Sequence, residues 1–190
     1  MTADGARLAL TPQTPTDLRV AAVFQAVTDR GSPVSHLYRT LAHAPAMLQA
    51  WTNLAWPLRT ECRAPRALRE LAILRVAHLA GSHYEWAHHV PLARDHQVTE
   101  RQIESVRSWQ EAGCFDPLQR ATLDVVDSIV VDGHVPDDRF GRLRALLDEQ
   151  ELVEIVLTSS FYVCVARVLA ALDVQLEPEF ARHLPAGGRP

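Results

Sequence analysis

The sequence contains no lysine, so all 19 of its basic side chains are arginines. Schiff-base catalysis, lysine-bound pyridoxal phosphate and a P-loop lysine each need a lysine amine, and the sequence therefore excludes them. The arginines are scattered along the chain, and with 23 acidic residues the formal net charge is −4. This balance argues against a surface for nucleic acid or an anionic membrane, and we expect a small-molecule partner.

Cysteine is scarce, and long apolar runs are absent. Cys62, Cys114 and Cys164 lie far apart and form no CxxC pair, and an odd number of isolated thiols is typical of a reducing compartment. The longest charge-free apolar stretch, 155–166, has 12 residues, which is too short to span a bilayer. We therefore expect a cytoplasmic protein with neither a signal peptide nor a membrane span.

Length and periodicity indicate one all-α domain. The chain of 190 residues is 47% hydrophobic, which is enough for one core. We expect an extended N-terminal arm over 1–15, a single helical domain over 16–184 and a flexible tail over 185–190. Apolar spacing, caps and breakers predict no strand, and helices over 17–30, 35–42, 45–58, 65–79, 82–95, 99–111, 116–131, 136–147 and 150–172. The last helix is apolar on most sides, so we expect it to be buried centrally or in a subunit interface.

The best candidate site is the run Gly81–His89, at the start of a predicted helix. Helical spacing places Ser82, Glu85 and His89 on one face, and a carboxylate four residues before an imidazole can hydrogen-bond it and raise its basicity. Such a pair suits general acid/base chemistry, and the free N–H groups of the helix N-terminus suit an anionic substrate. Further candidates for substrate binding in the same run are Tyr84, Trp86 and His88.

Simpler interpretations of these residues stay open. Ser82-x-x-Glu85 matches a capping box, and a lone histidine on a half-buried helix face is often structural. Glu70 shares an apolar face of the preceding helix, where burial would raise its pKa, but it is also spaced for an i, i+4 pair with Arg66. HExxH is absent, and His83 and His88 point away from the Glu85/His89 face, so we expect no metal site.

Three stretches of the chain resemble the carboxymuconolactone decarboxylase family, including its alkylhydroperoxidase D-like branch. They are RALRELAILRVAHLAGSHYEWAHHVPLARDHQVTERQIESV, FDPLQRATLDVVD and ELVEIVLTSSFYVCVARVLAAL, and the resemblance covers about residues 35–175. It implies an all-α helical bundle that associates as a homotrimer or homohexamer.

The family motif assigns roles to particular residues. In the peroxidase branch a glutamate on one helix precedes a CxxC pair, and a histidine follows four residues after the second cysteine. The resemblance implies that Glu70 is this glutamate and His89 this histidine, while Ser82 and Glu85 occupy the cysteine positions. Serine and glutamate cannot form the thiolate or the disulfide that reduces a hydroperoxide, so thiol peroxidase chemistry is disfavoured.

The resemblance then implies a cofactor-independent lyase or isomerase of the decarboxylase type. His89, oriented by Glu85 or Glu70, would move a proton on a small carboxylated, lactone or enolisable substrate. Trp51, Trp56 and Phe161 are candidates for pocket residues lent by a neighbouring subunit. Two alternatives remain: a non-catalytic helical oligomer or ligand-binding module, and a peroxidase-related activity through a distant thiol.

Overall fold

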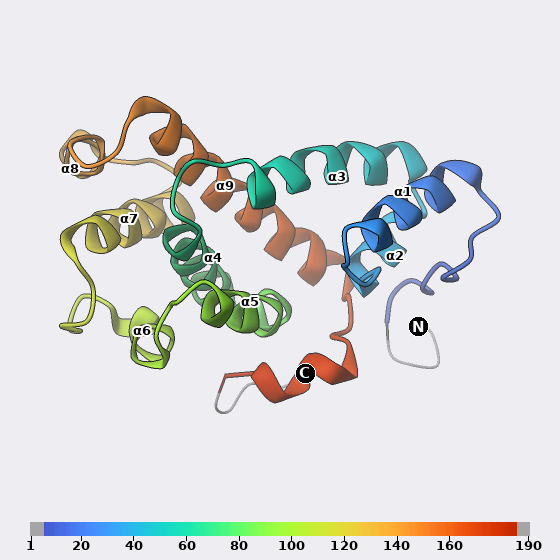
Figure 1. The fold of residues 1–190 in the computed structure, drawn as a ribbon. Coiled ribbons are helices and arrows are strands. Elements are labelled where there is room, and N and C mark those ends of the chain that lie inside the picture. Colours follow the sequence, from blue (N-terminus) through green and yellow to red (C-terminus); the bar gives the residue numbers. More distant parts are fainter. Residues whose placement is uncertain (1–5, 186–190) are drawn as a thin grey trace.

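The computed structural model describes residues 6–185, and within that range the chain is helical with no strand (Figure 1). The α-helices are α1 (Leu18–Asp29), α2 (His36–Leu41), α3 (Pro45–Thr60), α4 (Arg66–Ala80), α5 (His83–Asp95), α6 (Glu100–Ser105), α7 (Pro117–Asp127), α8 (Asp137–Arg144) and α9 (Glu149–Leu172). Short 3₁₀ segments cover Val106–Ser108 (η1) and Pro178–His183 (η3), and a π-helical segment, η2, covers Ser128–Asp132. The predicted all-α fold is confirmed.

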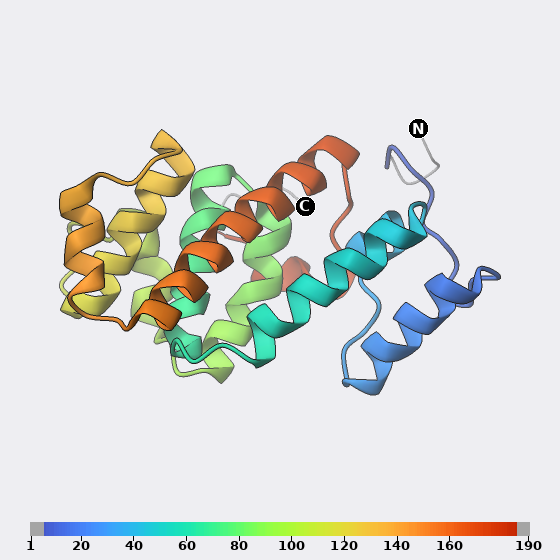
Figure 2. The same ribbon diagram turned by 90° about the horizontal axis from the view of Figure 1, so that it is seen from above.

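Helix α4 lies at the centre of the bundle, where it packs against α5, α7 and α9. Its residues from Leu68 to Ala77 are all buried, which is possible because the segment is apolar on nearly every side and its charged residues find partners. Figure 2 shows α9 crossing the molecule obliquely beside α3 and α4. This arrangement leaves a space between α3, α5 and α9 that side chains from each helix line.

Helix α9 has 24 residues, twice the length of the charge-free apolar stretch 155–166 from which no membrane span was expected. Its best 18-residue window has a mean hydropathy of 2.0, so by length and composition alone the helix could cross a membrane. In the fold 44% of that window is buried, with Ile155, Tyr162 and Leu169 among the buried side chains. A core helix passes the same test, and packing against α4 accounts for the buried part of this apolar surface. The homo-oligomer remains a prediction.

The predicted helix starts agree with the structure because capping is local. The side chains of Asp17, Ser35, Ser82 and Asp148 each accept a backbone N–H at the start of a helix. Gly81 ends α4 with φ 67°, in the left-handed region that favours glycine. The α4–α5 corner therefore lies where the sequence places it.

Three predicted helices are shorter than expected. The helix expected over 99–111 is α-helical only to Ser105, since the Arg75 guanidinium takes the carbonyl oxygens of Val106 and Arg107 at 3.1 and 2.7 Å. The helix expected over 116–131 changes to π-helix at Ser128, whose hydroxyl donates to the Asp124 carbonyl. The helix expected over 136–147 covers 137–144 and contains a glycine, a weak helix former.

The two ends of the described chain differ in secondary structure: the N-terminal end has no helix, and the C-terminal end forms η3. Residues 6–17 contain no helix, as expected for that part of the N-terminal arm; residues 1–5 lie outside the described residues. The flexible tail expected from residue 185 likewise lies outside them, except for Pro185 itself. Segment η3, which the sequence analysis did not predict, packs against α5.

Candidate active site

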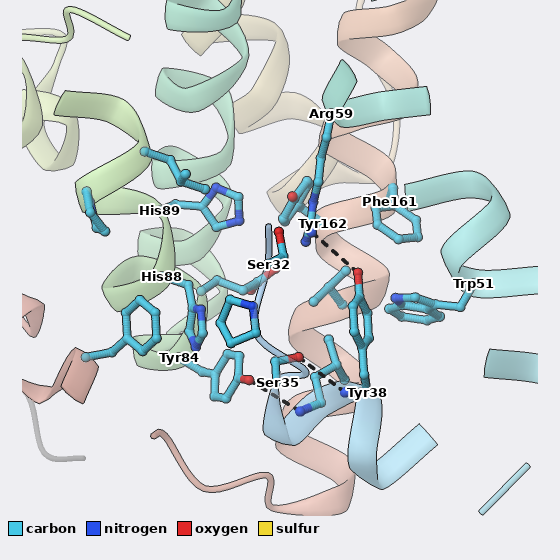
Figure 3. Close-up of a pocket in the computed structure, with 17 residues that line it drawn as sticks. Ser32, Ser35, Tyr38, Trp51, Arg59, Tyr84, His88, His89, Phe161 and Tyr162 are labelled. Carbon is cyan, nitrogen blue, oxygen red and sulfur yellow. Dashed lines mark hydrogen bonds between the residues drawn. The ribbon is translucent and has the colours of Figure 1, made fainter. Parts of the chain in front are cut away.

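A cavity of about 210 Å³ lies between α3, α5, α9 and the 32–38 segment, with η3 at one side (Figure 3). Aromatic and titratable side chains line its walls. The polar ones include Arg59, Tyr84, Glu85, His88, His89 and Tyr162. A small concave site with a few converging polar groups is the usual form of a ligand-binding pocket.

The central contact is a hydrogen bond between helices α4 and α5. His89 Nδ1 lies 2.8 Å from Glu70 Oε2, and the two residues are 4% and 0% exposed. The other carboxylate oxygen of Glu70, Oε1, accepts from Arg66 Nε at 2.6 Å. The predicted ion pair of Glu70 with Arg66 therefore forms, and the same carboxylate also contacts His89. Glu70, rather than Glu85, is the carboxylate that holds His89.

The charges of this pair follow from its surroundings. Burial opposes the charge of Glu70, but His89 and Arg66 together lower the pKa of its carboxyl, so it is ionised. Burial lowers the pKa of His89, and nearby Arg59 and His88 act in the same direction against the attraction of Glu70. A neutral imidazole must donate its Nδ1 proton to the carboxylate, which leaves the Nε2 lone pair as the basic site. Nε2 has no hydrogen-bond partner within residues 6–185, and His89 lines the cavity.

Glu85 is another buried carboxyl group, and it lines the cavity; its protonation state is opposite to that of Glu70. It is 2% exposed, and neither of its carboxyl oxygens has a hydrogen-bond partner among the described residues. Burial raises the pKa of Glu85 to about 8. The group is therefore mostly a neutral carboxylic acid at pH 7, with a proton available to donate.

The capping interpretation of Ser82 and Glu85 is half realised. Ser82 Oγ accepts from the backbone N–H of Glu85 at 3.4 Å, but no return bond from the Glu85 carboxyl is formed. Ser82 lines a separate cavity beside the end of α9, not the one at His89. Capping thus explains Ser82 and leaves the Glu85 carboxyl unexplained.

Tyr84 and His88 form the outer wall of the cavity together with the C-terminal segment. The rings of Tyr84, His88 and Phe180 stack in series, with centroid distances of 4.5 and 3.9 Å. The Glu177 carboxylate joins the layers, because it accepts from Tyr84 Oη at 2.8 Å, from the His36 backbone N–H at 2.6 Å, and contacts His88 Nε2 at 2.7 Å. These bonds lower the pKa of Glu177 to about 2, although burial opposes its charge.

Other predicted residues are placed differently. Trp86 packs in the core beneath α5, with Arg107 over its ring at 4.8 Å, and does not line the cavity. Trp51 and Phe161 do line it, 5.1 Å apart, within the same chain. Trp56 lies against the core and between arginines. Within residues 6–185 no group of three or more His, Cys, Asp or Glu side chains is arranged to hold a metal ion.

Sequence reasoning missed Arg59, Tyr162, Glu177 and Phe180. Each comes from an element remote from the Gly81–His89 run, and no local motif marks it. The only usable signal was the apolar face of α9, on which Tyr162 is a polar exception.

Comparison with known proteins shows which family part of the chain is similar to. Residues 45–128 match the profile of the Carboxymuconolactone decarboxylase family. YdfG of Bacillus subtilis (strain 168), an uncharacterized protein, is 31% identical over 94 residues, which is 48% of this chain and 64% of YdfG. The match therefore spans less than two thirds of that relative.

Two solved structures share the fold over nearly all of both chains. An uncharacterized peroxidase-related protein from Silicibacter sp. TM1040 superposes with a TM-score of 0.79 at 18% identity, covering 92% of this chain and 93% of that one. The debrominase Bmp8, solved in complex with 2,3,4-tribromopyrrole, gives 0.78 at 18% identity, covering 93% and 95%. At these identities the likeness establishes the fold.

Proposed function

We propose that the chain is a member of the carboxymuconolactone decarboxylase family, whose model its residues 45–128 match, and that it catalyses cofactor-independent proton transfer on a small molecule. The reaction class is that of a lyase or isomerase, decarboxylase-like, acting on a carboxylated, lactone or enolisable substrate. The observation that carries the proposal is the buried Glu70–His89 pair, whose basic nitrogen belongs to a cavity wall.

The three side chains divide the chemistry. His89 accepts a proton from carbon through Nε2, while Glu70 fixes the tautomer and stabilises the imidazolium that forms. Glu85 is a neutral acid on the same wall and supplies a proton or a hydrogen bond to the developing enolate or leaving group. Such a pair of groups with pKa values pushed apart is the arrangement that general acid/base catalysis needs.

The related peroxidase-type proteins suggest thiol chemistry as a competitor, but the cysteines do not favour it. Cys62, Cys114 and Cys164 are free thiols, and none lines the cavity. Burial raises the pKa of the Cys62 thiol, which lowers its thiolate fraction.

The test is the replacement of His89 by Asn. Small lactones, aromatic acids and unsaturated acids are first screened for thermal stabilisation, and hits are incubated with enzyme in D₂O while NMR follows deuterium entry at carbon and product formation. We expect His89→Asn to stay folded and to lower the rate by at least ~10²-fold, the usual size of a general acid/base contribution. His96→Asn, at the exposed end of the same helix, should keep the full rate. An unchanged rate in His89→Asn would show that another group transfers the proton, and no reaction of any hit with wild type would leave the non-catalytic ligand-binding module as the better interpretation.

A further inference from the structure

Arg59, in the last turn of α3, is a cation on the cavity wall that lacks an anionic partner. Its Nη1 donates to Tyr38 Oη at a long 3.4 Å, and its Nε has neither solvent contact nor a hydrogen-bond partner. No carboxylate within the described residues forms an ion pair with it. A guanidinium stays charged at every accessible pH, so this charge is always present.

The neighbouring carboxyl groups do not neutralise Arg59. The charge of Glu70 is already shared between Arg66 and His89. Glu85 is mostly uncharged at pH 7, because burial raises its pKa to about 8. Among the described side chains that line the cavity, Arg59 is the one that is charged at every accessible pH. A partly buried cation with an unsatisfied N–H is costly unless a ligand supplies the counter-charge.

The surroundings of Arg59 are suited to one kind of ligand. The Tyr162 hydroxyl on α9 is buried beside the Arg59 guanidinium, from which its oxygen accepts, and burial raises the pKa of Tyr162, so the hydroxyl keeps a proton to donate to a ligand. Figure 3 shows Arg59 reaching down between Tyr162 and Tyr38, with Phe161 and Trp51 to one side. Guanidinium and phenol donors together favour a carboxylate, and the flanking rings favour a flat apolar body.

We propose that Arg59 binds the anionic group of the substrate, with Tyr162 as a second donor, and that the substrate is a planar aromatic or conjugated carboxylate. The inference rests on the proposed function for the position of the reacting carbon, at the His89 and Glu85 side of the same cavity. Arg59 thereby becomes the residue that determines specificity for an anion, while His89 determines the reaction.

Calorimetric titration with trans-cinnamate and with its uncharged amide tests this assignment without needing the true substrate. Wild type should bind cinnamate at least about tenfold more tightly than cinnamamide, since a charge-assisted hydrogen bond is worth that factor or more. Arg59→Gln should lose this preference by weakening cinnamate alone. Arg59→Lys keeps the charge for folding but lacks the planar fork, and should bind cinnamate with intermediate affinity.

Two further variants separate the possible failures. Arg63→Gln removes an arginine of the same charge that is 60% exposed in its side chain, and should keep the full preference. The cinnamate preference of wild type and the rate loss of His89→Asn are measured separately, so a missing preference with an intact rate loss, or the reverse, identifies which proposal has failed. Equal cinnamate affinity in folded Arg59→Gln and wild type would overturn the assignment, as would wild type that does not prefer cinnamate or binds neither probe.

Discussion

Glu70 and Glu85 lie on adjoining helices, and both are almost completely buried, at 0% and 2% exposed. Glu70 has Arg66 and His89 as partners and is ionised, whereas Glu85 has no partner for either carboxyl oxygen and is mostly neutral at pH 7. Burial raises the pKa of a carboxyl in both places, so the supply of partners decides the outcome. One fold thereby places an ionised carboxylate against His89 and a neutral carboxylic acid on the wall of the cavity that His89 also lines.

The largest change in the free energy of unfolding at pH 7 should come from neutralising Glu70, the ionised carboxyl of the two. Glu70→Gln leaves Arg66 without its counter-charge and gives His89 Nδ1 a neutral amide in place of a carboxylate, and breaking a buried pair from one side costs about 3–5 kcal/mol. Chemical denaturation at pH 7 measures the loss. Glu85→Gln is the matched comparison, because it replaces an uncharged group by an uncharged group and should change the stability far less. Equal losses in the two variants would contradict the assigned protonation states.

The pH dependence of stability should show that the Glu85 carboxyl is protonated in the folded protein at neutral pH. Because the pKa of Glu85 rises from 4.5 to about 8 on folding, the folded state binds more protons over that range and stability falls as pH rises through it. At about 1.4 kcal/mol for each pKa unit, the loss of stability amounts to about 5 kcal/mol. Denaturation curves between pH 4.5 and 9 should show Glu85→Gln gaining on wild type up to pH 8 and no further. Glu149→Gln, 92% exposed in its side chain, should run parallel to wild type.

The smallest effect concerns the cap that holds the backbone of Glu85. Ser82→Ala removes the acceptor for the Glu85 N–H and should cost about 1 kcal/mol, the usual value for a lost N-cap. The Ser82 hydroxyl also favours the ionised form of the Glu85 carboxyl, so the loss should be larger at pH 9 than at pH 5. A loss that is the same at both pH values would show that the hydroxyl acts on the backbone alone.

The helices could be predicted from the sequence to the extent that their ends are local events. Asp17, Ser82 and Gly81 determine starts and stops within a few residues of themselves, so the α4–α5 corner is readable without a fold. The early end of α6 is not, because the side chain responsible, Arg75, comes from a helix far back in the chain.

The same distinction applies to the site. Position along α5 made His89 and Glu85 candidates, but it also suggested a bond between them that does not form. The partner of His89 is Glu70, which lies 19 residues away. Arg59 and Tyr162 approach each other only when the fold brings α3 and α9 to the same cavity, and no period or motif along the chain records that arrangement.

The cavity wall is built from two parts of the chain, because Phe180 of the C-terminal segment stacks on His88 of α5. Phe180 lies on the cavity wall yet falls outside 45–128, the part that matches the family profile, whereas Glu70, Glu85 and His89 fall inside it. Substitutions in 177–183 therefore change the shape of the cavity beside Tyr84 and His88 without altering Glu70, Glu85 or His89. A descendant of this protein could acquire a new ligand by drift at its C-terminal end and keep the proposed proton-transfer groups unchanged.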